Sequence, residues 1–317
     1  MSQAEAPPLP GVEIWRGGVN TWECDENAHM NVRFFVARAM EGLITLAAEL
    51  GLPHAFSAHA GATLLVREHH IRFMREAHEN APLHMLGGVV SIDESEAWLL
   101  QLLVHSNTGE IAASFQTRVA HATPREGRVF PWSRRTLDLA QALKVEVPET
   151  ARARSVSLEP FEPTAGLERA QALGLTRIGL GGVTPAECDI FGRARPELFI
   201  GRVSDGIAGL IRPFRHAIIE HADTRPARIG GAVLEYRIAY LDWLRAGDRF
   251  ELRSGLIDAT HRTMRMAHWM LDPQTGKAVA TSEAVAITMD LDARKVVPIT
   301  EAAQAVLRQQ ATAGLGL

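Results

Sequence analysis

Three polar residues at alternate positions, Asp25, Asn27 and His29, are the part of the sequence best suited to chemistry. A carboxylate can attack a carbonyl carbon as a nucleophile or, as a general base, take a proton from water. Nearby amide and imidazole groups can orient the water or the substrate. The carbonyl oxygen also needs donors, and the first backbone N–H groups of a helix have no partner inside that helix. Asp25 is therefore a candidate catalytic carboxylate that lies just ahead of a helix.

That helix is expected over about 32–50. Its apolar residues cover most of its faces, which is typical of a buried helix, and Gly51 suits its C-terminal cap. Asn31 could cap the helix. Capping is also the alternative interpretation of Asp25 and Asn27, because Asp and Asn are common ahead of helices. The apolar residues of the expected helix are Phe34, Phe35, Met40, Leu43, Ile44, Leu46 and Leu50.

The segment with the candidate carboxylate occurs twice. Glu-Cys-Asp is found at 23–25 and again at 187–189, which is 164 positions later (189 − 25), and Phe35 and Phe199 keep the same separation. A second helix is expected at 196–211. Such self-similarity predicts two copies of one structural unit.

A second correspondence follows downstream. Residues 66–85 align with 233–252 at a shift of 167 (233 − 66), and both segments alternate between apolar and polar residues as strands do. The same shift places Thr108-Gly109 on Thr275-Gly276, and these dipeptides suit hairpin turns between strands. One buried helix followed by antiparallel strands predicts an α+β fold, in which each sheet wraps around a long central helix.

The repeat also suggests domain boundaries. We expect the first repeat at 1–125, a connector at 126–180 and the second repeat with a C-terminal tail at 181–317. A short helix is expected within the connector, near 134–144.

The motif Asp25-Glu26-Asn27-Ala28-His29-Met30-Asn31, followed by Phe35, resembles the signature of hot-dog-fold acyl-CoA and acyl-ACP thioesterases. Its D-x-N-x-H core is also similar to that of plant acyl-ACP thioesterases, in which the Asp, Asn and His are implicated in catalysis. The resemblance implies a tandem double hot-dog, with Asp25, Asn27 and His29 as catalytic residues and Asn31 and Phe35 as substrate-binding residues. The plant enzymes have a further catalytic Glu on a later strand, for which the sequence alone identifies no match.

The second copy departs from this motif. Asp189 is retained, but Phe191, Arg193 and Arg195 stand where the first copy has Asn, His and Asn. The D-x-x-G form that begins at Asp189 is similar to that of 4-hydroxybenzoyl-CoA thioesterases. Asp189 is either a second catalytic carboxylate or a structural residue in a site that only binds substrate. Arg193 and Arg195 could pair with Asp189, bind CoA phosphates or lie solvated at the surface.

The implied function is hydrolysis of an acyl-CoA or acyl-ACP thioester to an acid and a thiol, with no cofactor and no metal. One alternative is a hot-dog enoyl-CoA hydratase, whose G-D-x-N-P-x-H pattern places the His five residues after the Asp rather than four. Another is a hot-dog protein that binds acyl-CoA without hydrolysing it, because a fold alone does not define a function. The acyl group, its carrier, the activity of the second copy and the role of Asp25 as nucleophile or general base stay open.

The bulk composition excludes several other classes. A net charge of −4 with scattered Lys and Arg gives no reason to expect nucleic acid, and no apolar run approaches the ~20 residues that span a membrane. The N-terminal segment 1–15 has no secretory-signal pattern and is expected to be a short flexible lead-in. Two cysteines in 317 residues do not make a disulfide framework, so a cytoplasmic protein is expected. The family resemblance alone implies that double hot-dogs could pair into homo-oligomers. Cys24 and Cys188 are expected to be packing residues. His69 and His70 point to opposite faces of a strand and do not predict a metal site.

Overall fold

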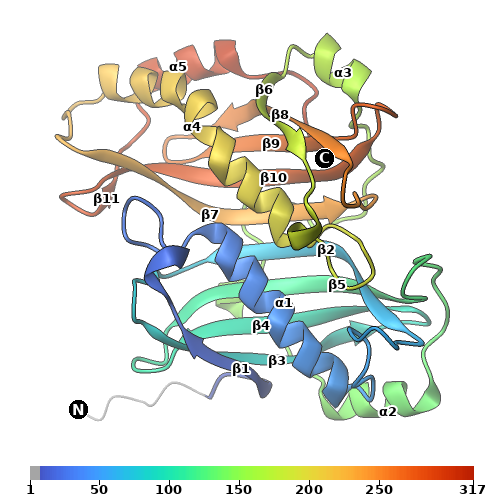
Figure 1. Cartoon of the computed structure of the whole chain (residues 1–317). Helices are drawn as coiled ribbons and strands as arrows, with labels where there is room; N and C mark the ends of the chain where they lie inside the picture. The colour runs from blue at the N-terminus through green and yellow to red at the C-terminus, as the bar shows by residue number, and fades with distance from the viewer. Residues whose placement is uncertain (1–7) are drawn as a thin grey trace, which may run out of the picture. The chain divides into compact units, whose positions relative to one another are not determined.

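The computed structural model describes residues 8–317 of the chain (Figure 1). Residues 1–7, part of the expected lead-in, lie outside the described residues. The chain forms two compact units. The first contains the described residues up to 66 and Met74–Arg152, and the second contains Arg67–Phe73 and Ala153–Leu317.

The first unit is an antiparallel sheet with one long helix on it. Its strands lie in the order β1-β3-β4-β5, and the helix α1 crosses them (Figure 1). Phe35, Ala39, Leu43 and Leu46 of this helix are buried. The elements are β1 (Val12–Gly18), η1 (Thr21–Glu23), α1 (Val32–Glu49), β3 (Pro82–Ile92), β4 (Glu96–His105), β5 (Ile111–Ala122), α2 (Arg134–Ala142) and η2 (Glu149–Ala151).

The second unit repeats this plan. Its strands lie in the order β2-β7-β10-β9-β8-β6, with β11 beside β10, and the 67–73 part of β2 pairs with β7 from Glu68↔Ala239 to Arg72↔Glu235. The long helix α4 runs over this sheet and contacts the final helix, α5. The elements are β2 (Thr63–Phe73), α3 (Leu167–Ala172), β6 (Thr176–Gly182), η3 (Pro185–Glu187), α4 (Glu197–Glu220), β7 (Ile229–Tyr240), β8 (Arg249–Ala259), β9 (Met264–Leu271), β10 (Ala278–Asp290), β11 (Lys295–Val296) and α5 (Glu301–Gln310).

The predicted helices are present, and one is longer than expected. α1 ends at Glu49, and Gly51 follows it with φ +80°, as a C-terminal cap requires. α4 continues to Glu220 instead of ending near 211, because Phe214 and Ile218 bury one more apolar stretch of it in the core. The helix keeps Pro213 in its interior. The α+β class is confirmed.

The repeat extends further toward the N-terminus of each copy than the sequence indicated. Strand β6 lies at the sheet edge beside β8, as β1 lies at the edge beside β3, and the two strands are 164 residues apart (176 − 12). Residues 126–180, expected as a connector, contribute α2 to the first unit and α3 and most of β6 to the second.

A glycine on each central helix lets the edge strand approach. Gly42 of α1 faces Ile14 and Met85, and a Cβ there would lie 2.8 Å from the flexible Met85 Sδ. At the matching place on α4, a Cβ on Gly206 would overlap the backbone carbonyl oxygen of Ile178 in β6. A side chain tip can move aside, whereas a strand backbone is held by its ladder of hydrogen bonds.

Gly206→Ala is therefore expected to lower the free energy of unfolding by about 1–3 kcal/mol, because β6 must shift to admit the methyl group. The matched control is Gly209→Ala in the same helix, where a Cβ meets nothing within 4 Å. There the change should raise the free energy of unfolding by about 0.5–1 kcal/mol, as alanine favours helix. Urea unfolding measures both, and equal effects of the two variants would contradict this packing.

Candidate functional site

Asp25 holds together a tight loop directly ahead of α1. Its Oδ1 accepts the backbone N–H groups of Asn27 at 2.8 Å and His29 at 3.3 Å, and its own N–H donates to the His29 carbonyl oxygen at 2.8 Å. A bridge between Cys24 and Met30 closes the base of the loop. The side chain of Asp25 is thus engaged by the backbone of the residues that the motif comprises.

The second copy builds the same loop around Asp189. Oδ1 of Asp189 accepts the N–H groups of Phe191 at 2.8 Å and Arg193 at 2.9 Å, and a bridge between Cys188 and Ala194 closes it. Asp25 and Asp189 therefore share a structural role, even though the residues around them differ. Within residues 8–317, neither carboxylate binds an N–H group of the helix that follows, whose N-cap is Asn31 in the first copy and Pro196 in the second. The contacts therefore support a structural role within the loop rather than helix capping, and a chemical role for Asp25 is left to be tested.

The glutamates of the two Glu-Cys-Asp triplets also have one shared role. Glu23 is buried and forms an ion pair with Arg38 on α1, while Glu187 pairs with Arg202 on α4 at 2.6 Å. Each arginine follows its glutamate by 15 residues, so both copies fix the loop to the same place on the central helix. The sequence repeat contained this signal, because Arg38 and Arg202 keep the separation of 164.

The loops of the two copies differ in backbone strain at one position. Ala28 has φ +59°, a conformation that an L side chain rarely adopts, and Gly192 holds the matching position with φ +81°. Ala28→Gly is expected to raise the free energy of unfolding by about 0.5–1 kcal/mol, and Gly192→Ala to lower it by about 1 kcal/mol. Thermal unfolding of both variants measures this, and shifts of the same sign would contradict it.

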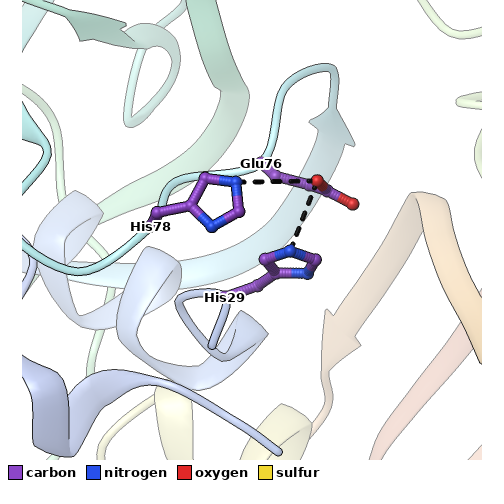
Figure 2. A group of neighbouring side chains, drawn as sticks. All are labelled: His29, Glu76 and His78. Carbon is purple, nitrogen blue, oxygen red and sulfur yellow. Dashed lines mark ion pairs between the residues drawn. The ribbon is translucent and has the colours of Figure 1, made fainter. Parts of the chain in front are cut away.

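His29 points from this loop toward Glu76 and His78, which follow strand β2 (Figure 2). Its Nε2 lies 3.4 Å from Oε2 of Glu76, and the His78 ring packs edge-on against the His29 ring with centroids 4.6 Å apart. The side chain of His29 is 18% exposed and that of Glu76 is 33% exposed, so both can be reached from solvent. The arrangement resembles a base and the carboxylate that orients it.

The backbone keeps these groups together. His29 and His78 form a backbone bridge, and the N–H of Met30 donates to the Ala77 carbonyl oxygen at 2.8 Å. The carbonyl oxygen of Glu76 lies 3.1 Å from Nε2 of His105 on β4. Glu76 was missed in the sequence because 47 residues separate it from His29. One signal was available, because the shift of 167 places Trp243 opposite Glu76, so the copies differ there as they do at His29.

In the second copy arginines replace the histidines. Arg193 and Arg245 form the backbone bridge that His29 and His78 form in the first copy. Nε of Arg193 donates to Oδ2 of Asp189 at 3.2 Å, and burial lowers the pKa of this arginine. Arg195 donates to the Ala186 carbonyl oxygen at 2.7 Å and forms an ion pair with Glu197.

The other predicted residues lie near the start of α1. Asn31 is the N-cap, where its Oδ1 accepts the N–H of Arg33 at 3.0 Å, and its carbonyl oxygen accepts the N–H of Phe34. Phe35 is buried in the core at 4% exposure. Asn27 is half-buried and donates its backbone N–H to Asp25.

The histidines in the sheet of the second unit, His69, His70 and His268, are fully buried. His69 contacts the hydroxyl of Tyr240 and His70 contacts Glu235, so the two rings have separate partners. Burial lowers the pKa of His69 and of His268 to about 3, which keeps both rings neutral. The free thiols of Cys24 and Cys188 each donate to a backbone carbonyl at 3.6 Å, and burial raises the pKa of both.

Comparison with known proteins identifies the family. The model of the Thioesterase-like superfamily matches residues 19–153 and again residues 183–307, so the chain belongs to this superfamily and carries its domain twice. The tandem double hot-dog fold is thereby confirmed. Membership supports thioester hydrolysis as the general class of reaction. No curated protein matches the sequence.

Solved structures with this fold span nearly the whole chain. A protein provisionally assigned as an oleoyl thioesterase from Lactobacillus plantarum matches with a TM-score of 0.63 at 11% identity, covering 86% of this chain and 94% of its own. The 12:0-ACP thioesterase from Umbellularia californica gives 0.62 at 10% identity, with 87% and 93% covered. An acyl-ACP thioesterase from Bacteroides thetaiotaomicron gives 0.56 at 9% identity, with 86% and 96% covered. At these identities the likeness establishes the fold. Within the described part of the chain, no helix has the length and apolar character needed to cross a membrane.

Proposed function

We propose that the protein is an acyl thioesterase whose chemistry is carried by the first copy. The observation that supports this most is the His29–Glu76 pair, with Nε2 and Oε2 3.4 Å apart and His29 three residues ahead of the first residue of α1. Catalytic pairs often tighten only when substrate binds, so this separation suits a free enzyme.

In the proposed mechanism Glu76 accepts a hydrogen bond from Nε2–H of His29, which holds the proton on Nε2 and leaves Nδ1 as the base. Nδ1 takes a proton from a water molecule, whose oxygen attacks the thioester carbonyl carbon. The oxyanion is stabilised by the amide of Val32, the first of α1, since the next two amides bond to Asn31. The C–S bond then breaks, and the His29 imidazolium returns its proton to the departing thiolate.

Asp25 acts in this proposal as a positioning residue. Its carboxylate accepts a hydrogen bond from the backbone N–H of His29 and thereby fixes the position of the backbone from which the imidazole extends. Asn27 lies in the same loop and would orient water or substrate. The alternative, in which Asp25 itself is the nucleophile or general base, is separated from this one by the variants described in the Discussion.

The second copy is proposed to bind rather than to hydrolyse. Arg193 replaces His29 there, and a guanidinium does not give up its proton in proteins, so it cannot serve as a base. Asp189 then serves as the structural centre of its loop. Arg195, whose side chain is 44% exposed, remains a candidate for contact with the phosphates of a CoA or phosphopantetheine carrier, whereas the Arg193 side chain is 7% exposed and bound to Asp189.

The proposed substrates are acyl-CoA or acyl-ACP thioesters, handled by a cytoplasmic protein without a cofactor. Lipid metabolism is the corresponding setting. Assembly of the double hot-dogs into homo-oligomers stays a prediction.

A panel of acyl-CoA and acyl-ACP thioesters of different chain lengths, assayed by the release of free thiol, tests the proposal. Thiol release from at least one member is expected. No release from any member would contradict hydrolysis, and hydration of an enoyl-CoA without thiol release would favour the hydratase alternative. Tight binding of acyl-CoA with no turnover would instead favour a carrier or sensor.

A further inference from the structure

His29, Glu76 and His78 point their ligand atoms toward one common position (Figure 2). Oε2 of Glu76 lies 3.4 Å from Nε2 of His29 and 3.9 Å from Nε2 of His78, and one ligand atom from each side chain lies within 4.8 Å of the others. Ligands of a tetrahedral zinc ion, each at 2.0–2.1 Å from the metal, are about 3.3 Å apart. The three side chains are therefore close to a metal-binding geometry.

To complete the metal-binding geometry, the ring of His78 must move closer to the other two ligands. The side chain of His78 is 59% exposed, so its ring can turn to shorten the longer separations by roughly 0.5–1.5 Å. The backbones of His29 and His78 are already joined by their bridge, which sets the spacing of the two imidazoles without further ordering.

We propose that His29, Glu76 and His78 bind one divalent transition-metal ion of the zinc class, and that the bound ion inhibits the enzyme. Two imidazoles and one carboxylate suit zinc, whereas magnesium and calcium prefer oxygen ligands. The ion would bind Nε2 of His29 and the carboxylate of Glu76. These two groups would then no longer bond to each other, so the His29–Glu76 pair required for proton transfer would be lost. Metal binding stands on the geometry alone, and the inhibition rests on the proposed function.

The site belongs to the first copy only. The residues at the matching positions of the second copy are Arg193, Trp243 and Arg245, none of which is a zinc ligand. Among residues 8–317, His29, Glu76 and His78 form the one group of three such side chains close enough to share an ion. The expected stoichiometry is one ion per chain.

Direct binding tests the site without reference to activity. The full chain is titrated with Co²⁺, followed by the visible absorption of tetrahedral cobalt, and with Zn²⁺ in competition with a chromophoric chelator. We expect one ion per chain and at least about tenfold weaker binding in His78→Gln and in Glu76→Gln. The matched control is His59→Ala, which removes an exposed histidine outside the group and should bind as the wild type does. Absence of saturable binding, or equal affinity in His78→Gln and the wild type, would overturn the site.

Inhibition is then measured on the same samples by thiol release. We expect Zn²⁺ to stop the wild type at the concentration that saturates the site, and His78→Gln to need at least about tenfold more Zn²⁺. Binding as expected without slower thiol release would overturn the inhibition and keep the metal site. A protein that binds Zn²⁺ but releases no thiol under metal-free conditions would overturn the proposed function instead.

Discussion

Glu76→Gln is expected to lower kcat for thioester hydrolysis by about 10²–10⁴-fold while the protein stays folded. Glutamine keeps the shape of the side chain but not its charge, so it no longer holds the Nε2–H tautomer of His29 or stabilises the imidazolium. The effect should fall on kcat rather than KM, because the charge is needed in the transition state. Steady-state kinetics of thiol release measure it.

Two further variants are needed to interpret the loss of kcat in Glu76→Gln. Glu79→Gln removes an exposed carboxylate three residues away and should leave kcat unchanged. Asp25→Asn keeps an Oδ1 that can accept the N–H groups of Asn27 and His29, so it should retain far more activity than Glu76→Gln. If Asp25→Asn is inactive while Glu76→Gln is active, Asp25 is the nucleophile or base and the His29–Glu76 mechanism is wrong.

Arg237→Met is expected to cause the largest loss of stability, about 3–5 kcal/mol. The Arg237 side chain is 4% exposed, and its guanidinium binds both carboxylate oxygens of Glu68, with Nε to Oε1 at 2.8 Å and Nη2 to Oε2 at 3.3 Å. It also donates to the Ser157 carbonyl oxygen and lies over the Phe161 ring. Methionine fills part of the volume but leaves the Glu68 carboxylate buried without its cation. Urea unfolding measures the loss.

The double variant Glu68→Leu, Arg237→Met separates the charge from the packing. With both charges of this pair gone, neither partner is left buried without its counter-charge, so most of the lost stability should return. The coupling energy in the double-mutant cycle should therefore be large and should favour the double variant over the sum of the single ones. Strictly additive losses would show that packing, and not the ion pair, accounts for the effect.

The sequence predicted the repeated parts of the fold because the two copies test each other. A helix after Asp25 and another after Asp189, with the same offset in both copies, are hard to obtain by chance. The alternation of apolar and polar residues predicted the strands of the two sheets. The length of α4 was underestimated because an internal proline, Pro213, obscures the apolar positions of its last two turns. Strand β6 was assigned to the connector because glycines occupy three of its seven positions.

The candidate site was predicted only in part, for a different reason. Asp25, Asn27 and His29 are neighbours in the chain, so their type and spacing are visible in the sequence. Glu76 meets His29 only through the bridge between His29 and His78, a tertiary contact that local patterns do not encode. The structure also weakens the case for Asp25 as the catalytic base, since the retained Asp189 makes the same backbone contacts in a copy that lacks the histidine.

The central claim, that hydrolysis belongs to the first copy, is tested most directly by kcat for His29→Ala and Arg193→Gln on the best substrate of the panel. These substitutions change matching positions of the two loops. We expect His29→Ala to lower kcat by at least about 10²-fold and Arg193→Gln to leave kcat within about threefold of the wild type. Full activity in folded His29→Ala, or an equal loss of kcat in folded Arg193→Gln, would contradict the account.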